Sequence, residues 1–265
     1  MGSGDLDPNI RQFYQERYRE DGRLTRSAHG QLEFLRVQEL VRRFLPKPPA
    51  RVLDVGGATG IHAKWLADDG YVIHMIDPVP NHVNAAAQHG GYSVALGDAR
   101  ALDEPDDSAD AVLLFGPLYH LVDHADRLLA LRESVRVVRP GGQVMAAAIS
   151  RHAPVIEFGA TAGIASKDLE TWRQILATGH HDNEPDGFTA AHFHTAEELT
   201  DELRDAGLSD VTVLGIEGPT TPALDAAPLE QLSQLLPSAV LCARLLESEP
   251  QVIGASPHLL AIGNV

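Results

Sequence analysis

Short apolar runs alternate with helical segments from residue 51 to residue 149, and this alternation limits the folds available to the chain. Five runs are predicted strands: Arg51–Val55, Tyr71–Ile76, Tyr92–Leu96, Ala109–Phe115 and Gln143–Ile149. Near-continuous apolar strands are typical of a parallel sheet covered by helices on both faces. Two later runs, Val211–Ile216 and His258–Ile262, raise the predicted total to seven strands. The sequence therefore predicts an α/β fold with helices on both faces of one sheet.

Two regions fall outside this alternation and are not needed to build the sheet. The first contains two predicted helices, Pro8–Glu20 and Ala28–Leu45. The second, Ser150–His194, is too long for a simple connection and includes a helix at Lys167–Thr178. We expect both regions to form helical lid elements. The chain is interpreted as one domain, residues 1–265, made of a helical cap (1–48), a first half of the sheet (49–149), a lid insertion (150–195) and a second half (196–265).

Composition excludes several classes of partner. The formal net charge is −16 at pH 7, and no cluster of basic residues interrupts it. Nucleic acids and anionic membrane surfaces are bound through basic patches, so neither is an expected partner. No apolar run approaches the roughly 20 residues that span a bilayer, and we expect no secretory signal. With Cys242 alone there is no internal disulfide. A cytoplasmic location is expected, and a homodimer is left open.

The segment from Val52 to Gly60 is the most informative motif, because a strand leads there into a glycine-rich turn that opens a helix. Gly56, Gly57 and Gly60 let the backbone approach a ligand closely. A dinucleotide-binding G-x-G-x-x-G turn is the alternative. It fits poorly, because Ala58 and Ile61 stand where its second and third glycines would be. It also leaves Asp54, two residues before the first glycine, unexplained.

This segment resembles motif I of the class I S-adenosylmethionine-dependent methyltransferases, an acidic residue followed by three glycines at alternate positions. Asp54, Gly56 and Gly60 match that pattern, and Ala58 departs from its middle glycine. The resemblance implies a Rossmann-like seven-stranded, mostly parallel sheet whose last strand is antiparallel. It also implies S-adenosylmethionine as the cofactor, S-adenosylhomocysteine as its product, and residues 49–149 as the cofactor-binding half.

Further features fall where the family places them. Asp77 and Pro78 follow the second strand, where the resemblance implies a carboxylate that accepts from the ribose hydroxyls. Asp98 and Ala99 follow the third strand, where an acid would accept from the adenine amino group. A Pro-Gly-Gly turn at residues 140–142 precedes the fifth strand. Taken alone, each feature is more often a helix cap or a solvated turn residue than a functional one, but their order and spacing together favour the methyltransferase interpretation.

The segment after the fourth strand carries the candidate catalytic residues, because ligands of open α/β sheets bind at the carboxyl ends of the strands. Phe115 replaces the asparagine of the motif used to methylate bases or glutamine amides, which disfavours that chemistry. Phe115 and Tyr119 are candidates for cation–π contact with the cofactor sulfonium. His120 is the candidate base or orienting group, with Tyr119 and His194 as helpers. The alternative for His120 is a cap of the next helix.

Residues of the cap and lid complete the predicted site. Tyr14 and Tyr18 are expected to close over the cleft or to anchor the first helix, and Leu118 to contact the substrate. His192 and His194, like the pair His180-His181, lack a third ligand at metal-site spacing. A lid-packing or solvated role is therefore favoured for these histidines, and no metal is expected.

Together these features predict an S-adenosylmethionine-dependent methyltransferase that acts on a small molecule, a bacterial secondary metabolite, by in-line transfer of a methyl group to O, N or C. Two alternatives remain: a peptide or protein methyltransferase, and a non-catalytic S-adenosylmethionine-binding regulatory subunit. A nicotinamide-dependent oxidoreductase is disfavoured, because the sequence lacks the G-x-G-x-x-G turn.

Overall fold

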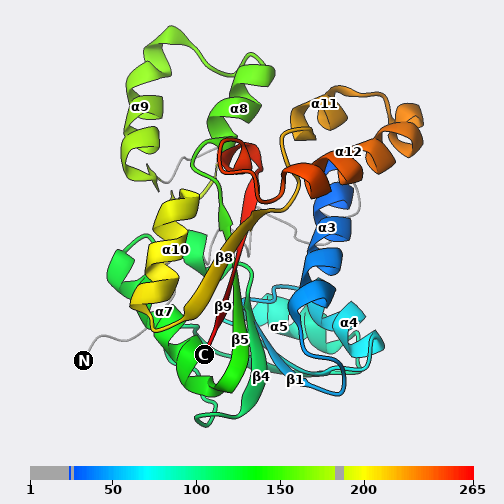
Figure 1. Ribbon diagram of the computed structural model, residues 1–265, viewed down its shortest axis with the longest axis vertical. Helices are drawn as coiled ribbons and strands as arrows, with labels where there is room; N and C mark the ends of the chain where they lie inside the picture. The colour runs from blue at the N-terminus through cyan, green and yellow to red at the C-terminus, as the bar shows by residue number, and fades with distance from the viewer. Residues whose placement is uncertain (1–23, 25–26, 183–187) are drawn as a thin grey trace.

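A seven-stranded sheet forms the centre of the protein, with the strand order β3-β2-β1-β4-β5-β9-β8 (Figure 1). The strands are β1 Arg51–Val55, β2 Val72–Asp77, β3 Ser93–Leu96, β4 Ala109–Leu114, β5 Val138–Ile149, β8 Ser209–Gly215 and β9 His258–Asn264. Strands β1 to β5 are parallel, and β9 runs antiparallel to both β5 and β8. The predicted seven-stranded, mostly parallel sheet is confirmed.

The structure, a computed structural model, describes residue 24 and residues 27–182 and 188–265. The predicted helix Pro8–Glu20, with Tyr14 and Tyr18, lies outside the described residues, and so do the roles expected for them. None of the helices in the described ranges combines the length and the apolar character needed to cross a membrane.

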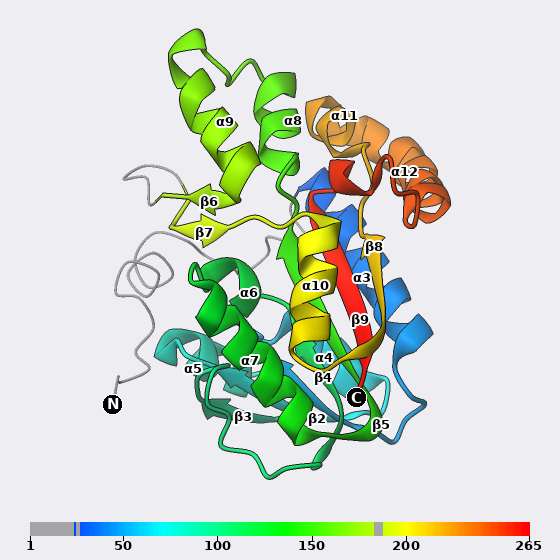
Figure 2. The same ribbon diagram turned by 60° about the vertical axis from the view of Figure 1, so that its left-hand side comes forward.

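Helices cover both faces of the sheet because successive strand residues point to opposite sides. On β1, Val52 packs in one core and Leu53 in the other, and both are fully buried. The Val52 side is covered by α3 Ala28–Phe44, α4 Ile61–Asp68 and α5 Pro80–Ala87. The Leu53 side is covered by α6 Pro117–His120, α7 His124–Val137 and α10 Ala196–Asp205 (Figure 2). Burial on both faces explains why the strands lack polar alternation.

The lid insertion leaves and rejoins the sheet at one place. Strand β5 ends at Ile149, whose carbonyl oxygen accepts a hydrogen bond from the His194 amide, and the Arg151 amide donates to the His194 carbonyl. Between these points lie α8 Ala153–Ala160, α9 Leu169–Thr178 and a hairpin of β6 His180–His181 and β7 Ala191–His192. Figure 1 shows α8 and α9 standing beyond the upper end of the sheet. The predicted helix at Lys167–Thr178 is present, whereas α8 and the hairpin were not predicted.

Two further helices pack against the first described helix. They are α11 Thr221–Ala226 and α12 Leu232–Leu246, which contains Pro237. Their side chains Leu224 and Ala239 form a small core with Ala28 and Leu32 of α3. Helix α11 was not predicted, because six residues are too few to show helical periodicity.

A buried arginine fastens α3 to the far edge of the sheet. Arg36 is fully buried, and its Nε donates to the Ile216 carbonyl oxygen at 3.1 Å. Its Nη1 donates to Glu39 at 2.6 Å, and its Nη2 forms an ion pair with Glu247. The guanidinium therefore satisfies a carbonyl and two carboxylates that lie far apart in sequence.

We predict that Arg36→Met lowers the free energy of unfolding by roughly 1–3 kcal/mol, since the buried Ile216 carbonyl oxygen loses its donor and Glu39 and Glu247 each lose one arginine partner. Urea denaturation measures the change. The control is Arg173→Met, which removes an exposed pair with Glu170 and should leave stability almost unchanged. Equal effects of the two substitutions would contradict a structural role for Arg36.

Candidate functional site

The turn after β1 has the backbone conformation that its glycines predict. The φ angles of Gly56 and Gly60 are +75° and +83°, in the left-handed region that favours glycine. A Cβ at Gly56 would lie 2.6 Å from Cδ of Pro117, the first residue of α6. The absence of a side chain therefore lets the glycine turn pack directly against the segment that follows β4.

Ala58 also has a left-handed conformation, with φ of +49°. L-residues with a Cβ adopt this conformation at a cost, which explains why the resemblance implies glycine here. The strain is balanced by a specific bond, because the Ala58 amide donates to Oδ2 of Asp77 at 2.9 Å.

Asp77, at the end of β2, organises three segments around the cleft. Oδ2 accepts from the Ala58 amide, as described above. Oδ1 accepts from the Val79 amide at 2.9 Å and from Nδ1 of His82 at 3.1 Å. The side chain is nearly buried yet lies in the cleft wall. Asp77 therefore organises the cleft through the protein's own groups, and the ribose contact that the resemblance implies stays a prediction.

Asp54 is a fully buried carboxylate beneath the glycine turn. Neither oxygen has a hydrogen-bond partner of normal geometry among the described residues. Burial raises its pKa to about 7, the negative charge of Asp77 adds to the rise, and the Ala63 amide offsets it only in part. An unsatisfied carboxylate in a ligand cleft is a site for a positively charged group.

Asp98 reaches the cleft wall but is held by a neighbouring arginine. Its Oδ1 accepts from the Arg100 amide at 2.8 Å, and its Oδ2 accepts from Nη2 of Arg100 at 2.7 Å. Arg100 also pairs with Asp126. The carboxylate is thereby fixed at the end of β3, next to Ala99, which lies in the same wall.

Aromatic and imidazole rings form the opposite wall. The Phe115 ring meets His62 edge to face, with centroids 5.6 Å apart. Tyr119 and His120 have centroids 4.5 Å apart, and His120 lies 6.0 Å from Phe188 of the lid. The candidate catalytic pair thus faces both the cleft and the lid.

His120 is neutral at ordinary pH, because burial lowers its pKa to about 3. A neutral imidazole with so low a pKa is a weak base. The capping alternative is wrong, because His120 is the last residue of α6 and the N-cap of the next helix is Asp123. A neutral imidazole remains able to donate or accept one hydrogen bond at each nitrogen.

Most of the predicted site residues meet in one cleft at the carboxyl ends of β1, β2 and β4. Its cavity volume is about 120 Å³, and the cavity opens to the surface. The predicted residues that line it are Asp54, Gly56, Gly57, Ala58, Asp77, Pro78, Asp98, Ala99, Phe115, Tyr119 and His120. Gly60 is not in the lining; it is the N-cap residue of α4.

Two predicted residues are placed elsewhere. Leu118 is fully buried in the sheet core, because α6 turns its side chain inward, and it is not part of the cleft lining. His194 is fully buried behind the cleft, where Nε2 donates to Glu202 at 3.2 Å. Burial lowers the pKa of His194. Burial alone would raise the pKa of Glu202, but bonds from His194 and Arg127 bring it to about 2.

Three residues of the site were missed in the sequence. His82 holds Asp77, His62 contacts Phe115, and Phe188 faces His120. His82 lies five positions after Asp77, in the first turn of α5, and this spacing was the only signal. His62 and Phe188 carry no local motif, so only the fold brings His62 to the cleft wall and Phe188 next to His120.

The fold and the cleft together define a class I methyltransferase, and the comparisons agree. A family model described as a methyltransferase domain matches residues 28–213, so the chain belongs to the methyltransferase domain family. The ubiquinone biosynthesis O-methyltransferase of Methylobacterium nodulans is 28% identical over 180 residues, which is 66% of each chain. An uncharacterized methyltransferase of Mycobacterium bovis is 36% identical over 107 residues. That match covers 40% of this chain and 42% of the relative, so the chain spans about two fifths of its length.

A solved structure shares the fold along nearly the whole chain. It is an S-adenosylmethionine-dependent methyltransferase of Thermotoga maritima, described as a possible histamine N-methyltransferase. The TM-score is 0.61 at 20% identity, over 96% of this chain and 97% of that one. The family's cofactor is S-adenosylmethionine. The residues present fit this cofactor. The unsatisfied Asp54 carboxylate lies beneath the glycine-rich turn, where it could pair with the positively charged methionine end of the cofactor.

We predict that Ala58→Gly raises the free energy of unfolding by roughly 0.5–1 kcal/mol, because glycine adopts the left-handed conformation without the steric cost. Binding of S-adenosylhomocysteine should not weaken. Ala87→Gly, at the end of α5, is the control and should destabilise the protein. Thermal unfolding of both variants checks the sign; a destabilised Ala58→Gly protein would contradict the strain.

We also predict that affinity for S-adenosylhomocysteine falls as the pH drops below about 7, by up to about tenfold per pH unit. The Asp54 carboxyl, whose pKa is about 7, must lose its proton to pair with the ligand's ammonium group. Pairing is therefore favourable above this pH and is lost below it.

Calorimetry of the parent and of Asp54→Asn measures this dependence. The variant should bind more weakly at the higher pH and should lose the pH dependence. If both proteins show the same slope, another group causes it and Asp54 has no such role.

Proposed function

We propose that this methyltransferase acts on a small neutral or cationic acceptor, a bacterial secondary metabolite, and transfers the methyl group to O, N or C. The observation that carries the proposal is the chemistry of the cleft wall. Its charged side chains are Asp54, Asp77 and Asp98, and no lysine or arginine is present among the described residues that line it. Phosphorylated or polyanionic acceptors would lack a cationic partner there.

The chain's own residues mainly need to align the acceptor and exclude water. S-adenosylmethionine supplies a methyl group on an activated sulfonium. Alignment of an acceptor against it is worth roughly 7–11 kcal/mol. Phe115 and Tyr119 present ring faces or edges to the cleft and suit a cationic neighbour. His120, held neutral, accepts a hydrogen bond from a hydroxyl or amine acceptor and thereby orients its lone pair.

The relatives agree with a small acceptor and leave its identity open. The Methylobacterium nodulans relative is named for ubiquinone biosynthesis, and the Thermotoga maritima structure for histamine. A phenolic or amine acceptor, either neutral or cationic, suits the aromatic wall. A peptide acceptor and a non-catalytic cofactor-binding subunit are the outcomes that would replace this proposal.

We predict that His120→Phe lowers kcat at least tenfold with a hydroxyl or amine acceptor, while affinity for S-adenosylhomocysteine stays unchanged. Phenylalanine keeps a ring beside Tyr119 and removes the hydrogen bond. His120→Asn should recover part of the rate. In the parent, kcat should show no step from His120 at about pH 6.5, the usual histidine value.

The measurement uses labelled S-adenosylmethionine with matched acceptors that differ only by a phosphate group. His89→Ala, an exposed position outside the cleft lining, is the control. Preference for the phosphorylated acceptors or for a peptide would refute the proposed acceptor class. Cofactor binding without turnover on any acceptor would indicate a regulatory subunit, and full activity of His120→Phe would remove His120 from the mechanism.

A further inference from the structure

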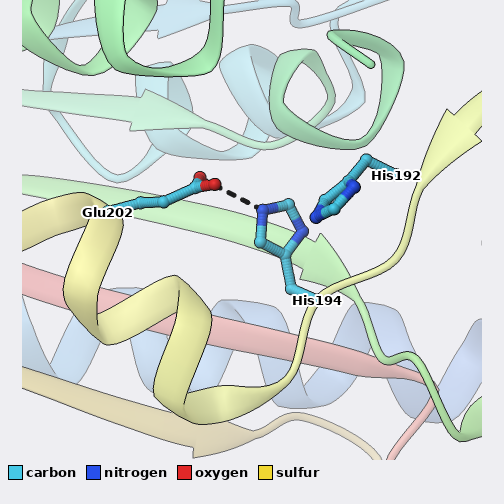
Figure 3. Close-up of side chains that lie close together, drawn as sticks. All are labelled: His192, His194 and Glu202. Carbon is cyan, nitrogen blue, oxygen red and sulfur yellow. Dashed lines mark hydrogen bonds and ion pairs between the residues drawn. The ribbon is translucent and has the colours of Figure 1, made fainter. Parts of the chain in front are cut away.

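Two histidines of the lid and one glutamate of the sheet domain converge behind the cleft. His192 ends β7, His194 follows two residues later, and Glu202 lies on α10. Figure 3 shows both imidazoles and the carboxylate pointing toward one another. Their exposed fractions are 6%, 0% and 2%, so the group is shielded from water. None of the three lines the cleft.

The donor atoms have the spacing of a metal site. One donor atom from each residue lies within 4.8 Å of the other two. Nε2 of His194 and Oε2 of Glu202 are 3.2 Å apart. That contact is a hydrogen bond, and it leaves Nδ1 as the nitrogen that His194 can offer to an ion. The bond to Glu202 holds the imidazole ring in place, as carboxylates do for histidine ligands of metals.

The second nitrogen of His194 provides an independent indication. Nδ1 is buried and has no hydrogen-bond partner among the described residues, although the side chain is completely shielded from solvent. Because Nε2 donates to Glu202, Nδ1 carries the lone pair, and an unpartnered buried lone pair indicates a missing proton donor or metal ion. The His192 ring stands next to it, with centroids 4.6 Å apart and planes at 84°.

Neighbouring side chains hold the three residues in place. Arg127 donates to Oε1 of Glu202 from Nη2 at 2.7 Å and from Nε at 2.9 Å. Glu198 lies 3.0 Å from Nε2 of His192, and Arg151 forms an ion pair with Glu198. Such outer contacts orient ligands in established metal sites.

We propose that His192, His194 and Glu202 bind a divalent transition-metal ion, with Zn²⁺ the best match, and that the ion fastens the lid to α10. Two imidazoles and one carboxylate with an open fourth position are a common zinc ligand set. The sequence offered the two histidines without a third ligand, and the fold supplies it from a helix that begins after the lid ends.

The bound ion has a structural consequence for the proposed acceptor site. Strand β7 contacts α6, which carries Tyr119 and His120. Arg127, which holds Glu202, also donates from Nη1 to the carbonyl oxygens of Leu121 and Val122, directly after α6. The ion thus fixes the lid and, through Arg127, the segment that carries His120.

The test is metal binding itself, independent of methyl transfer. Chelator-stripped parent protein is titrated with ZnCl₂ by calorimetry, and metal content and thermal midpoint are measured after dialysis. We expect one bound Zn²⁺ per chain and a raised midpoint. Substitution of Zn²⁺ by Co²⁺ should give the strong visible absorption of a tetrahedral site.

Two variants locate the ion. His192→Gln and Glu202→Gln should each weaken Zn²⁺ binding at least tenfold and remove the rise in midpoint. His180→Gln, an exposed lid histidine paired with Asp182, is the matched control and should bind like the parent. Circular dichroism confirms that each variant is folded; if Glu202→Gln is not, His192→Gln alone decides.

The proposal is overturned if the stripped parent takes up no Zn²⁺, which would leave the three residues as a hydrogen-bonded network. It is also overturned if both variants bind like the parent. A second buried group, Glu33, Glu217 and His258, has its donor atoms equally close. Loss of the ion on Glu33→Gln, with retention in His192→Gln, would place the ion there instead.

Discussion

The Asp77 carboxylate is the interaction on which the cleft depends. It joins the glycine turn after β1, through Ala58, to the start of α5, through Val79 and His82. Strands β1 and β2 are parallel neighbours, so their carboxyl ends meet and one side chain can bridge both loops. The bridge holds a left-handed alanine that would otherwise relax, and its negative charge raises the pKa of Asp54. Organisation of the turn and the protonation of Asp54 are therefore coupled.

A second polar network connects the lid to the segment that follows His120. Glu202 accepts from His194 of the lid and from Arg127 of α7, and Arg127 reaches the backbone after α6. These groups are nearly fully buried, so their bonds are hard to replace with water. A shift of the lid would take the His194 bond from the buried Glu202 carboxylate, which would keep its ion pair with Arg127. These bonds hold the base of the lid, around His194, in one arrangement. Helices α8 and α9 lie beyond it and expose large apolar side chains, including Phe158 and Leu169.

The sequence predicts the parts of this fold that repeat. Strand β1 and helix α3 are found within one residue of their predicted bounds, because a short apolar run that leads into a glycine turn and a helix with apolar steps of three and four are strong patterns. The antiparallel last strand came from the family resemblance. Two-residue strands such as β6 carry no period. Contacts such as His194 with Glu202 join a loop to a helix eight positions on, and no periodic pattern encodes them. Leu118 was misplaced because the direction of a one-turn helix depends on tertiary packing.

The neutral state of His120 determines how much positive charge the cleft wall places near a bound cofactor. A base with a pKa of about 3 is weak, and the assistance it gives to proton removal is correspondingly small. A charged imidazolium in the cleft wall would repel the positively charged sulfonium of a bound cofactor. The burial that weakens His120 as a base therefore also keeps a positive charge away from the cofactor. A methyl donor that already carries its leaving group needs alignment more than basicity, so a weak base at this position is compatible with methyl transfer.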